Sequence, residues 1–259
     1  MTAGAMTSLV AVSAATVEAD TLTVEKRDLA LRNWDANGFK VALLADLHVD
    51  SATEAEHTAN AFRLAMAENP DLIVIPGDFI TLGQKPSRTL IHRGLEPLRD
   101  AKCPVLGTLG NHDYDTRSVT KMPEILRNSP VRLLRNESVE VSGITVAGVD
   151  DAIAGRHDLR FLEGNSFSKS TLALFHEPDY VDLMPTFVSL QLSGHSHGGQ
   201  ICLPGGIPVH TPRGANKYIV GYYPDTRIPL YVTRGIGTSG PRWRLFCRPE
   251  ITILTLNAA

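Results

Sequence analysis

The chain has 259 residues, a formal net charge of −3 and a hydrophobic fraction of 43%. This length fits one large or two small domains. The slightly acidic balance argues against a binder of duplex nucleic acid, which usually has a basic domain. The three cysteines are scattered and form no Cys-x-x-Cys pair, so neither a disulfide framework nor a thiolate zinc site is indicated. We expect reduced, partly buried thiols.

The first seventeen residues carry no charged side chain. This run is shorter than the roughly 20 apolar residues that a membrane span needs, and it lacks the basic start of a signal peptide. We therefore expect residues 1–20 to be a flexible tail or the remnant of an anchor or signal, and residues 21–259 to form one domain. A remnant would place the protein at a membrane or outside the cytoplasm, and a simple tail would leave it cytoplasmic.

The first part of the chain alternates predicted strands and helices. The almost continuous apolar run from Phe39 to Ala45 is typical of a strand buried on both faces. Apolar residues at helical spacing follow, and Asn69-Pro70 ends this helix. We predict strands at 39–45, 72–75 and 105–109, with helices at 54–68 and 88–100. This order indicates parallel strands joined by right-handed crossovers.

Shorter apolar runs separated by tight turns come next and predict more antiparallel pairing. They lie at 131–134, 138–141 and 144–149. Further strands are predicted at 171–175, 188–192, 230–233 and 251–256. About ten strands exceed a comfortable single open sheet. We therefore expect an α/β fold in which two packed mixed β-sheets are flanked by helices.

Potential metal ligands lie in five short clusters, each at the end of a predicted strand. They are Asp46 and His48, Asp78, Asn111, His176, and His195 with His197. In parallel α/β sheets, ligands bind beyond the carboxyl ends of the strands. Five strand ends that meet at one edge would bring all seven side chains together.

The donor types in these clusters suit two divalent ions. Asp46 and His48 are two residues apart, so both point to the same side of an extended backbone, and His195 and His197 repeat this spacing. Asp78 follows a glycine, which permits a sharp turn, and its two oxygens could bridge both ions. Mixed imidazole and oxygen ligation suits manganese, iron or zinc. A pair of ions about 3.5–4 Å apart is suited to attack on phosphate esters.

The order of these motifs resembles the calcineurin-like metallophosphoesterase superfamily. Its pattern is Asp-x-His, Gly-Asp, Gly-Asn-His-Asp, His and Gly-His-x-His. Gly-Asn-His-Asp-Tyr at 110–114, His-Glu-Pro-Asp at 176–179 and Gly-His-Ser-His-Gly-Gly-Gln-Ile-Cys-Leu-Pro at 194–204 are similar to the bacterial YkuE-like branch in particular. Residues 231–237 and 248–250 extend the resemblance to nearly the whole chain. It implies the calcineurin-like β-sandwich flanked by helices, with a dinuclear site.

The resemblance also implies roles for individual residues. One ion would be held by Asp46, His48, Asp78 and His197, and the other by Asp78, Asn111, His176 and His195. His112 would assist the leaving group, and imidazole is suited to donate a proton near neutral pH. We predict hydrolysis of phosphodiester or pyrophosphate bonds through a hydroxide that bridges the two ions. Manganese is the first expectation, with iron, zinc, magnesium and cobalt as alternatives.

The substrate is less well defined. Between residues 213 and 248 lie seven basic side chains, of which Arg213, Arg234 and Arg242 are candidates for substrate contacts, because guanidinium groups bind phosphate well. The branch includes enzymes that act on phosphodiesters and on the pyrophosphate of acylated sugar nucleotides. By analogy, this suggests a lipid- or nucleotide-linked substrate such as UDP-2,3-diacylglucosamine, with peripheral membrane association. The alternatives are a phosphomonoesterase, including a protein phosphatase, and a non-catalytic scaffold. No protein partner is predicted.

Overall fold

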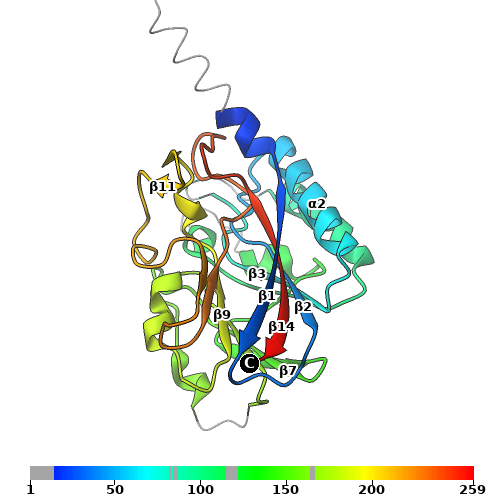
Figure 1. The fold of residues 1–259 in the computed structure, drawn as a ribbon. Helices are drawn as coiled ribbons and strands as arrows, with labels where there is room; N and C mark the ends of the chain where they lie inside the picture. The colour runs from blue at the N-terminus through cyan, green and yellow to red at the C-terminus, as the bar shows by residue number, and fades with distance from the viewer. Residues whose placement is uncertain (1–14, 82, 84–86, 115–121, 164–166) are drawn as a thin grey trace, which may run out of the picture.

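The computed structural model describes residues 15–81, 83, 87–114, 122–163 and 167–259, and its main strands form two six-stranded sheets (Figure 1). The first sheet contains, in spatial order, β1 (Thr23–Leu31), β14 (Glu250–Ala258), β2 (Phe39–Leu43), β3 (Leu72–Pro76), β4 (Val105–Thr108) and β5 (Arg132–Leu133). The second contains β12 (Gly221–Tyr223), β13 (Leu230–Val232), β9 (Leu190–Ser193), β8 (Thr171–Leu174), β7 (Ile144–Gly148) and β6 (Glu137–Val141). A separate small hairpin joins β10 (Cys202–Leu203) to β11 (Ile207–Pro208).

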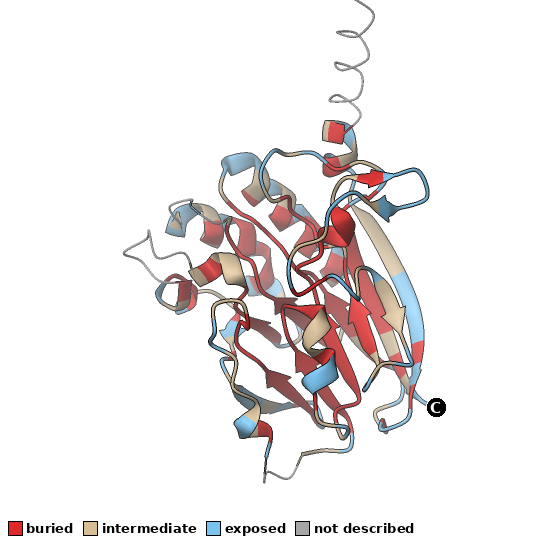
Figure 2. Cartoon of the chain, turned by 90° about the vertical axis from the view of Figure 1, so that its left-hand side faces the viewer, coloured by how far each residue is buried: buried red, intermediate tan, exposed pale blue. Residues whose placement is uncertain are grey.

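The central strands of both sheets are buried on both faces, which explains the continuous apolar runs in the sequence. Alternation along β2 sends Val41 and Leu43 into the layer between the sheets and Ala42 to the opposite face. In Figure 2, buried residues accordingly follow the strands through the interior. The outer face of the first sheet is covered by helices α2 (Ala52–Ala67), α3 (Arg88–Leu95) and α4 (Met122–Leu126). The 3-10 helices η3 (Leu159–Leu162) and η4 (Pro178–Leu183) contribute to the core on the outer face of the second.

The helix ends follow local chemistry. Helix α2 begins after Ser51, whose side chain accepts the Glu54 N–H at 3.2 Å. The predicted helix at 88–100 divides into α3 and the 3-10 helix η1 (Glu96–Asp100). Pro97 has no N–H to donate, so it cannot continue the α-helical hydrogen-bond pattern. The remaining 3-10 helices, η2 (Asn111–Tyr114) and η5 (His197–Gly199), lie in site loops.

The predicted α/β fold with two mixed sheets is confirmed, and three local differences are informative. Strand β5 pairs parallel to β4, so the antiparallel expectation for 131–134 is wrong, although β6 and β7 do form an antiparallel hairpin. Strand β1 was not predicted, because its exposed edge position leaves a polar sequence. It pairs in parallel with β14 along its full length. Neither the hairpin β10–β11 nor β12 was predicted, and all three strands are very short.

Residues 15–20 are helical and contact the C-terminal part of the chain. Ala15 and Ala19 are buried. The Glu18 carboxylate accepts the backbone N–H groups of Phe246 and Cys247 at 2.9 and 2.6 Å. The expected tail at 1–20 therefore ends in an ordered turn of helix, while residues 1–14 lie outside the described part of the chain. Among the described residues, no helix is both long and apolar enough to cross a membrane.

Candidate metal centre

The seven candidate ligands lie beyond the carboxyl ends of five strands. Strands β2, β3 and β4 run parallel, as do β8 and β9. The first sheet supplies Asp46, His48, Asp78 and Asn111, and the second supplies His176, His195 and His197. Because the two sheets end at the same edge, the site spans the layer between them.

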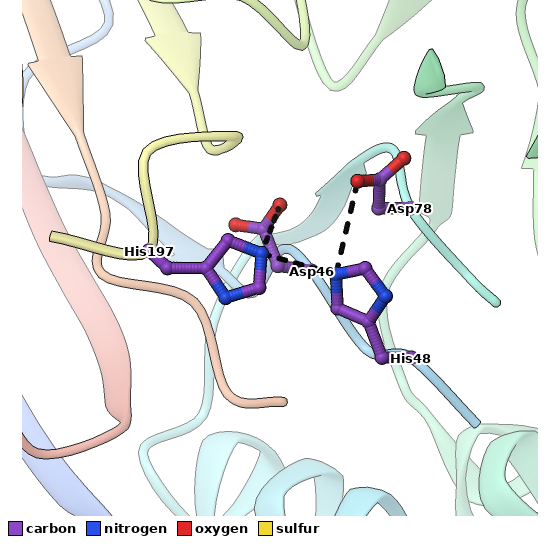
Figure 3. A group of neighbouring side chains, drawn as sticks. All are labelled: Asp46, His48, Asp78 and His197. Atoms are coloured by element: carbon purple, nitrogen blue, oxygen red, sulfur yellow. Dashed lines mark hydrogen bonds and ion pairs between the residues drawn. The ribbon is translucent and has the colours of Figure 1, made fainter. Parts of the chain in front are cut away.

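The histidine and aspartate side chains form two groups that share one carboxylate. Asp46, His48, Asp78 and His197 offer ligand atoms within 4.8 Å of one another, and so do Asp78, His176 and His195. All six residues are buried. Figure 3 shows the first group, with the two imidazoles and two carboxylates directed toward one another. Asp78 Oδ2 lies 3.7 Å from His48 Nε2 and 3.3 Å from His176 Nε2, so it lies between the two groups.

Five of these ligands have a backbone conformation that non-glycine residues rarely adopt. Their φ angles are positive, with values of 55° for Asp46, 47° for His48, 56° for Asp78, 68° for His195 and 51° for His197. Each such residue costs on the order of 1–3 kcal/mol, and strain of this kind concentrates at functional sites. All five residues lie in the loops directly after strands β2, β3 and β9.

Two glycines allow the loops of the site to approach one another. A Cβ on Gly77 would lie 2.6 Å from His176 Nδ1, and a Cβ on Gly235 would lie 2.6 Å from Asp46 Oδ2. Both residues also have positive φ, 92° and 67° respectively. Any side chain there would displace a candidate ligand.

Hydrogen bonds from the second ring nitrogen orient three of the histidines. His176 Nδ1–H donates to the Pro76 carbonyl at 2.7 Å, and His195 Nε2–H donates to the Arg213 carbonyl at 2.8 Å. His48 Nδ1 lies 3.1 Å from Thr81 Oγ1. These contacts leave His176 Nε2, His195 Nδ1 and His48 Nε2 directed into the site, which is how proteins fix the tautomer of a metal-binding imidazole.

Burial sets the charge state of the site. It lowers the pKa of His48 to about 3 and, with the charge of His176, that of His195 to about 4. Burial and His48 lower the pKa of His197 well below its ordinary value. These three imidazoles are therefore neutral, which is the form that binds a metal. Burial raises the pKa of the Asp46 carboxyl to about 7.

His176 and Asp78 behave as an ion pair. Burial works against both charges, but the Asp78 carboxylate raises the pKa of His176 well above its ordinary value. His176 and then His112 in turn lower the pKa of Asp78 well below its usual range. An imidazole binds a metal in its neutral form, so a cation held by Asp78 and His176 would release the His176 proton.

The residues present fit a pair of divalent ions. Asn111 Oδ1 is buried with no hydrogen-bond partner among the described residues, although buried polar atoms are normally paired. Nitrogen atoms of two histidine pairs also face each other, with His48 Nε2 3.0 Å from His197 Nε2 and His195 Nδ1 3.1 Å from His176 Nε2. Converging oxygen and imidazole groups that have only one another, or no partner in the case of Asn111 Oδ1, are the ligands that divalent transition metals prefer.

Asp113, which the sequence analysis did not single out, ties two ligand loops together. Its Oδ2 accepts the N–H of Asp78 at 3.0 Å and of Gly110 at 2.9 Å, and its Oδ1 accepts the N–H of Phe79 at 2.9 Å. Burial and the Asp78 charge raise the pKa of Asp113 to about 8, against the effect of these donors. The sequence did carry one indication of this role, because Asp113 directly follows the site residues Asn111 and His112 in Gly-Asn-His-Asp.

Arg244 holds the loop that contains His197, and the sequence analysis did not single it out either. Its guanidinium is fully buried and donates to five backbone carbonyls. These belong to His197, Arg234, Gly235, Gly237 and Cys247, at 2.7–3.2 Å. Cys247 Sγ contacts the His197 carbonyl at 3.2 Å. None of the three cysteines is paired with another in the structure, and Cys202 and Cys247 are buried.

A cavity of about 560 Å³ opens over the site, within the ordinary range for small-molecule sites. His112 lines it, and the His112 ring lies 5.0 Å from the His48 ring in an edge-on arrangement. The backbone N–H of His112 donates to Asp78 Oδ1 at 3.0 Å. The described lining consists of Asp78, Asn111, His112, His195, Ser196, His197, Gly199, Gln200, Ile201, Val209, His210, Pro212 and Ser239.

The three candidate arginines are absent from this described lining. Arg234 is paired with Glu250 at 2.7 Å and Glu25 at 3.2 Å, and Arg242 with Asp20 at 2.5 Å. The backbone of Arg213 orients His195, as described above. The ion pairs favour structural roles for Arg234 and Arg242, and substrate contact by any of the three stays a prediction.

Comparison with known proteins identifies the family. The profile of the calcineurin-like phosphoesterases matches residues 39–213, which include every candidate ligand. The chain belongs to this family. It is 32% identical over 235 residues to the uncharacterized metallophosphoesterase YkuE of Bacillus subtilis (strain 168), covering 86% of this chain and 80% of that protein. The chain is therefore a metal-dependent phosphoester hydrolase, as the sequence predicted.

Two other relatives extend this similarity across species. Phosphodiesterase YaeI of Escherichia coli (strain K12) is 30% identical over 236 residues, covering 88% of this chain and 86% of that protein. The transmembrane protein with metallophosphoesterase domain from Bos taurus is 31% identical, covering 86% of this chain and 54% of that protein. The chain thus matches most of the length of the two bacterial relatives and about half of the bovine protein.

Proposed function

We propose that the chain is a dinuclear phosphodiesterase or pyrophosphatase. The observation that carries this proposal is the position of Asp78, whose carboxylate belongs to both ligand groups. One ion would be held by Asp46, His48, Asp78 and His197. The other would be held by Asp78, Asn111, His176 and His195.

The ligand charges favour an anionic substrate. Two divalent ions held there would activate water and neutralise the phosphoryl oxygens. Asp46 and Asp78 contribute two negative charges, and the histidines and Asn111 are neutral when they bind metal. Two divalent cations carry four positive charges, so the loaded site would have a net charge of about +2 and would attract phosphate. The candidate ligands are buried, and electrostatic contacts are stronger where water is excluded.

We propose that His112 donates a proton to the leaving group. Its ring lines the cavity next to His48, and its backbone N–H to Asp78 Oδ1 fixes its position relative to the shared ligand. A positioned general acid typically contributes a factor of about 10²–10⁴. No protein nucleophile is needed, since water is the attacking group in this proposal.

The cavity favours a substrate with a group on each side of the phosphorus. Ile201, Val209 and Pro212 provide an apolar wall beside the ligands, and a second ester group or an acylated substituent would fill it. The name of the Escherichia coli relative, phosphodiesterase YaeI, supports the diester. A lipid-linked pyrophosphate such as UDP-2,3-diacylglucosamine, with peripheral membrane association, is the specific form of this proposal.

A panel of chromogenic esters tests the function. Metal-loaded protein is assayed with bis(p-nitrophenyl) phosphate, p-nitrophenyl phosphate and thymidine 5′-monophosphate p-nitrophenyl ester. We expect the two diesters to have the higher kcat/KM. A preference for the monoester would favour the phosphomonoesterase alternative, and no hydrolysis of any ester with two ions bound would contradict the proposal.

A further inference from the structure

Exposed apolar side chains gather at one end of the molecule. Nine large hydrophobic residues are exposed among the described residues, and six of them lie in three neighbouring segments. These six, which we call the apolar ridge, are Val17, Leu203, Ile207, Val209, Trp243 and Phe246. Single exposed apolar residues are normal, but a concentration of this kind marks an interaction surface.

Backbone contacts establish that the three segments are adjacent. Leu203 and Ile207 are cross-strand partners in the β10–β11 hairpin, so their side chains share one face. Ile201 pairs with Leu245, and the Arg244 N–H donates to the Ala15 carbonyl at 3.0 Å. In Figure 1, β11, the dark-blue helix of residues 15–20 and the orange-red segment before β14 accordingly lie at the same end.

The ridge is continuous with the candidate metal centre. Val209 is 63% exposed and also lines the cavity above the ligands. Ile201, at the base of the same hairpin, lines this cavity as well. A surface that covered the ridge would therefore lie at the entrance of the cavity.

The chemistry of the ridge identifies its partner. Trp243 and Phe246 lie within five residues of the exposed Arg248, and aromatic side chains near a basic residue are typical of the membrane–water interface. Arg242 is paired with Asp20 and Arg244 is buried, so Arg248 supplies the free positive charge among the described residues of this segment. The sequence up to Val17 has no charged side chain, so an uncharged run leads into the ridge. The exposed side chains belong to a hairpin, a loop and a helix, and of the six only Val209 is among the described cavity-lining residues, which suits insertion between lipid head groups better than a folded protein partner.

We infer that the apolar ridge seats on a lipid bilayer and places the cavity over phosphoester head groups. The inference rests on the proposed function for the identity of the bound group, but the seating itself does not require catalysis. Shallow insertion of several apolar side chains gives reversible binding that scales with the apolar area inserted.

Flotation of the full chain with vesicles tests the inference. One vesicle preparation contains phosphatidylcholine alone, and a second contains phosphatidylcholine and phosphatidylglycerol. The double variant Leu203→Ser/Ile207→Ser removes two ridge residues whose exposed fractions are 54% and 59%. The control, Leu183→Ser, removes a residue of η4 that is 55% exposed and lies outside the ridge. We expect the wild type and Leu183→Ser to float with the vesicles. We expect the double variant to bind the vesicles at least about tenfold more weakly. Metal content and thermal midpoint confirm that each variant is folded.

Two outcomes would overturn the inference. One is that wild-type protein binds neither vesicle, whether or not it self-associates or binds another protein. The other is that the double variant and Leu183→Ser bind equally well. Hydrolysis of bis(p-nitrophenyl) phosphate without vesicles is measured separately. Vesicle binding without such hydrolysis would contradict the proposed function and leave the seating supported.

Discussion

Gly77→Ala is expected to damage the site because Gly77 lies against a candidate ligand. The new Cβ would lie 2.6 Å from His176 Nδ1, which donates to the Pro76 carbonyl at 2.7 Å. The φ of +92° costs a non-glycine residue about 1–2 kcal/mol. The displaced hydrogen bond adds about 1 kcal/mol. We therefore expect the free energy of unfolding to fall by about 2–3 kcal/mol, and metal affinity to fall about 10–100-fold.

Gly143→Ala provides a matched control. Gly143 has a φ of 85°, and a Cβ there would meet nothing within 4 Å, so only the backbone cost of about 1–2 kcal/mol applies. Urea unfolding measures stability, and competition with a chromogenic chelator measures metal affinity. If Gly77→Ala matches Gly143→Ala in both measurements, the close packing of Gly77 on His176 does not support the site, and the reasoning fails.

Three further predictions concern the candidate metal centre directly. Asp78→Asn removes the shared charge, so we expect at most one retained ion by metal analysis and no measurable diester hydrolysis; two retained ions would exclude a bridging role. His112→Asn should lower kcat by about 10²–10⁴ while both ions stay bound, and loss of metal would mean that His112 is structural. Chelation should lower the thermal midpoint, because RT ln(1 + [L]/Kd) of stabilisation is lost; a midpoint that manganese or zinc fails to restore would contradict metal-linked stability.

The central strands and the ligand positions could be predicted because both depend on local sequence. Continuous apolar runs such as Leu72–Pro76 indicate strands buried on both faces, and each ligand cluster follows such a run. The topology rule for parallel sheets then brings the strand ends together. The sequence did not indicate that the site spans two sheets. Strands β8 and β9 belong to the second sheet because of pairings such as that of β9 with β13, which join residues distant in the chain.

The supporting residues were harder to predict for a physical reason. Arg244 is one of the seven basic residues between 213 and 248 that the sequence does not distinguish, but its side chain is fully buried and donates to backbone carbonyls. Backbone acceptors carry no sequence signal, so no side-chain pattern identifies such a partner. Arg234 and Arg242 are similarly paired with Glu25 and Asp20, which are far from them in the sequence. Strand β1 was missed because an edge strand does not need apolar residues on both faces.

Titration of metal-free protein with manganese tests the central claim most directly. Bound metal per chain and hydrolysis of bis(p-nitrophenyl) phosphate are measured on the same samples. The two ligand groups that share Asp78 predict binding that saturates at two ions, with activity that reaches its maximum only as the second ion binds. Saturation at one ion, or full activity before the second ion binds, would contradict a dinuclear centre.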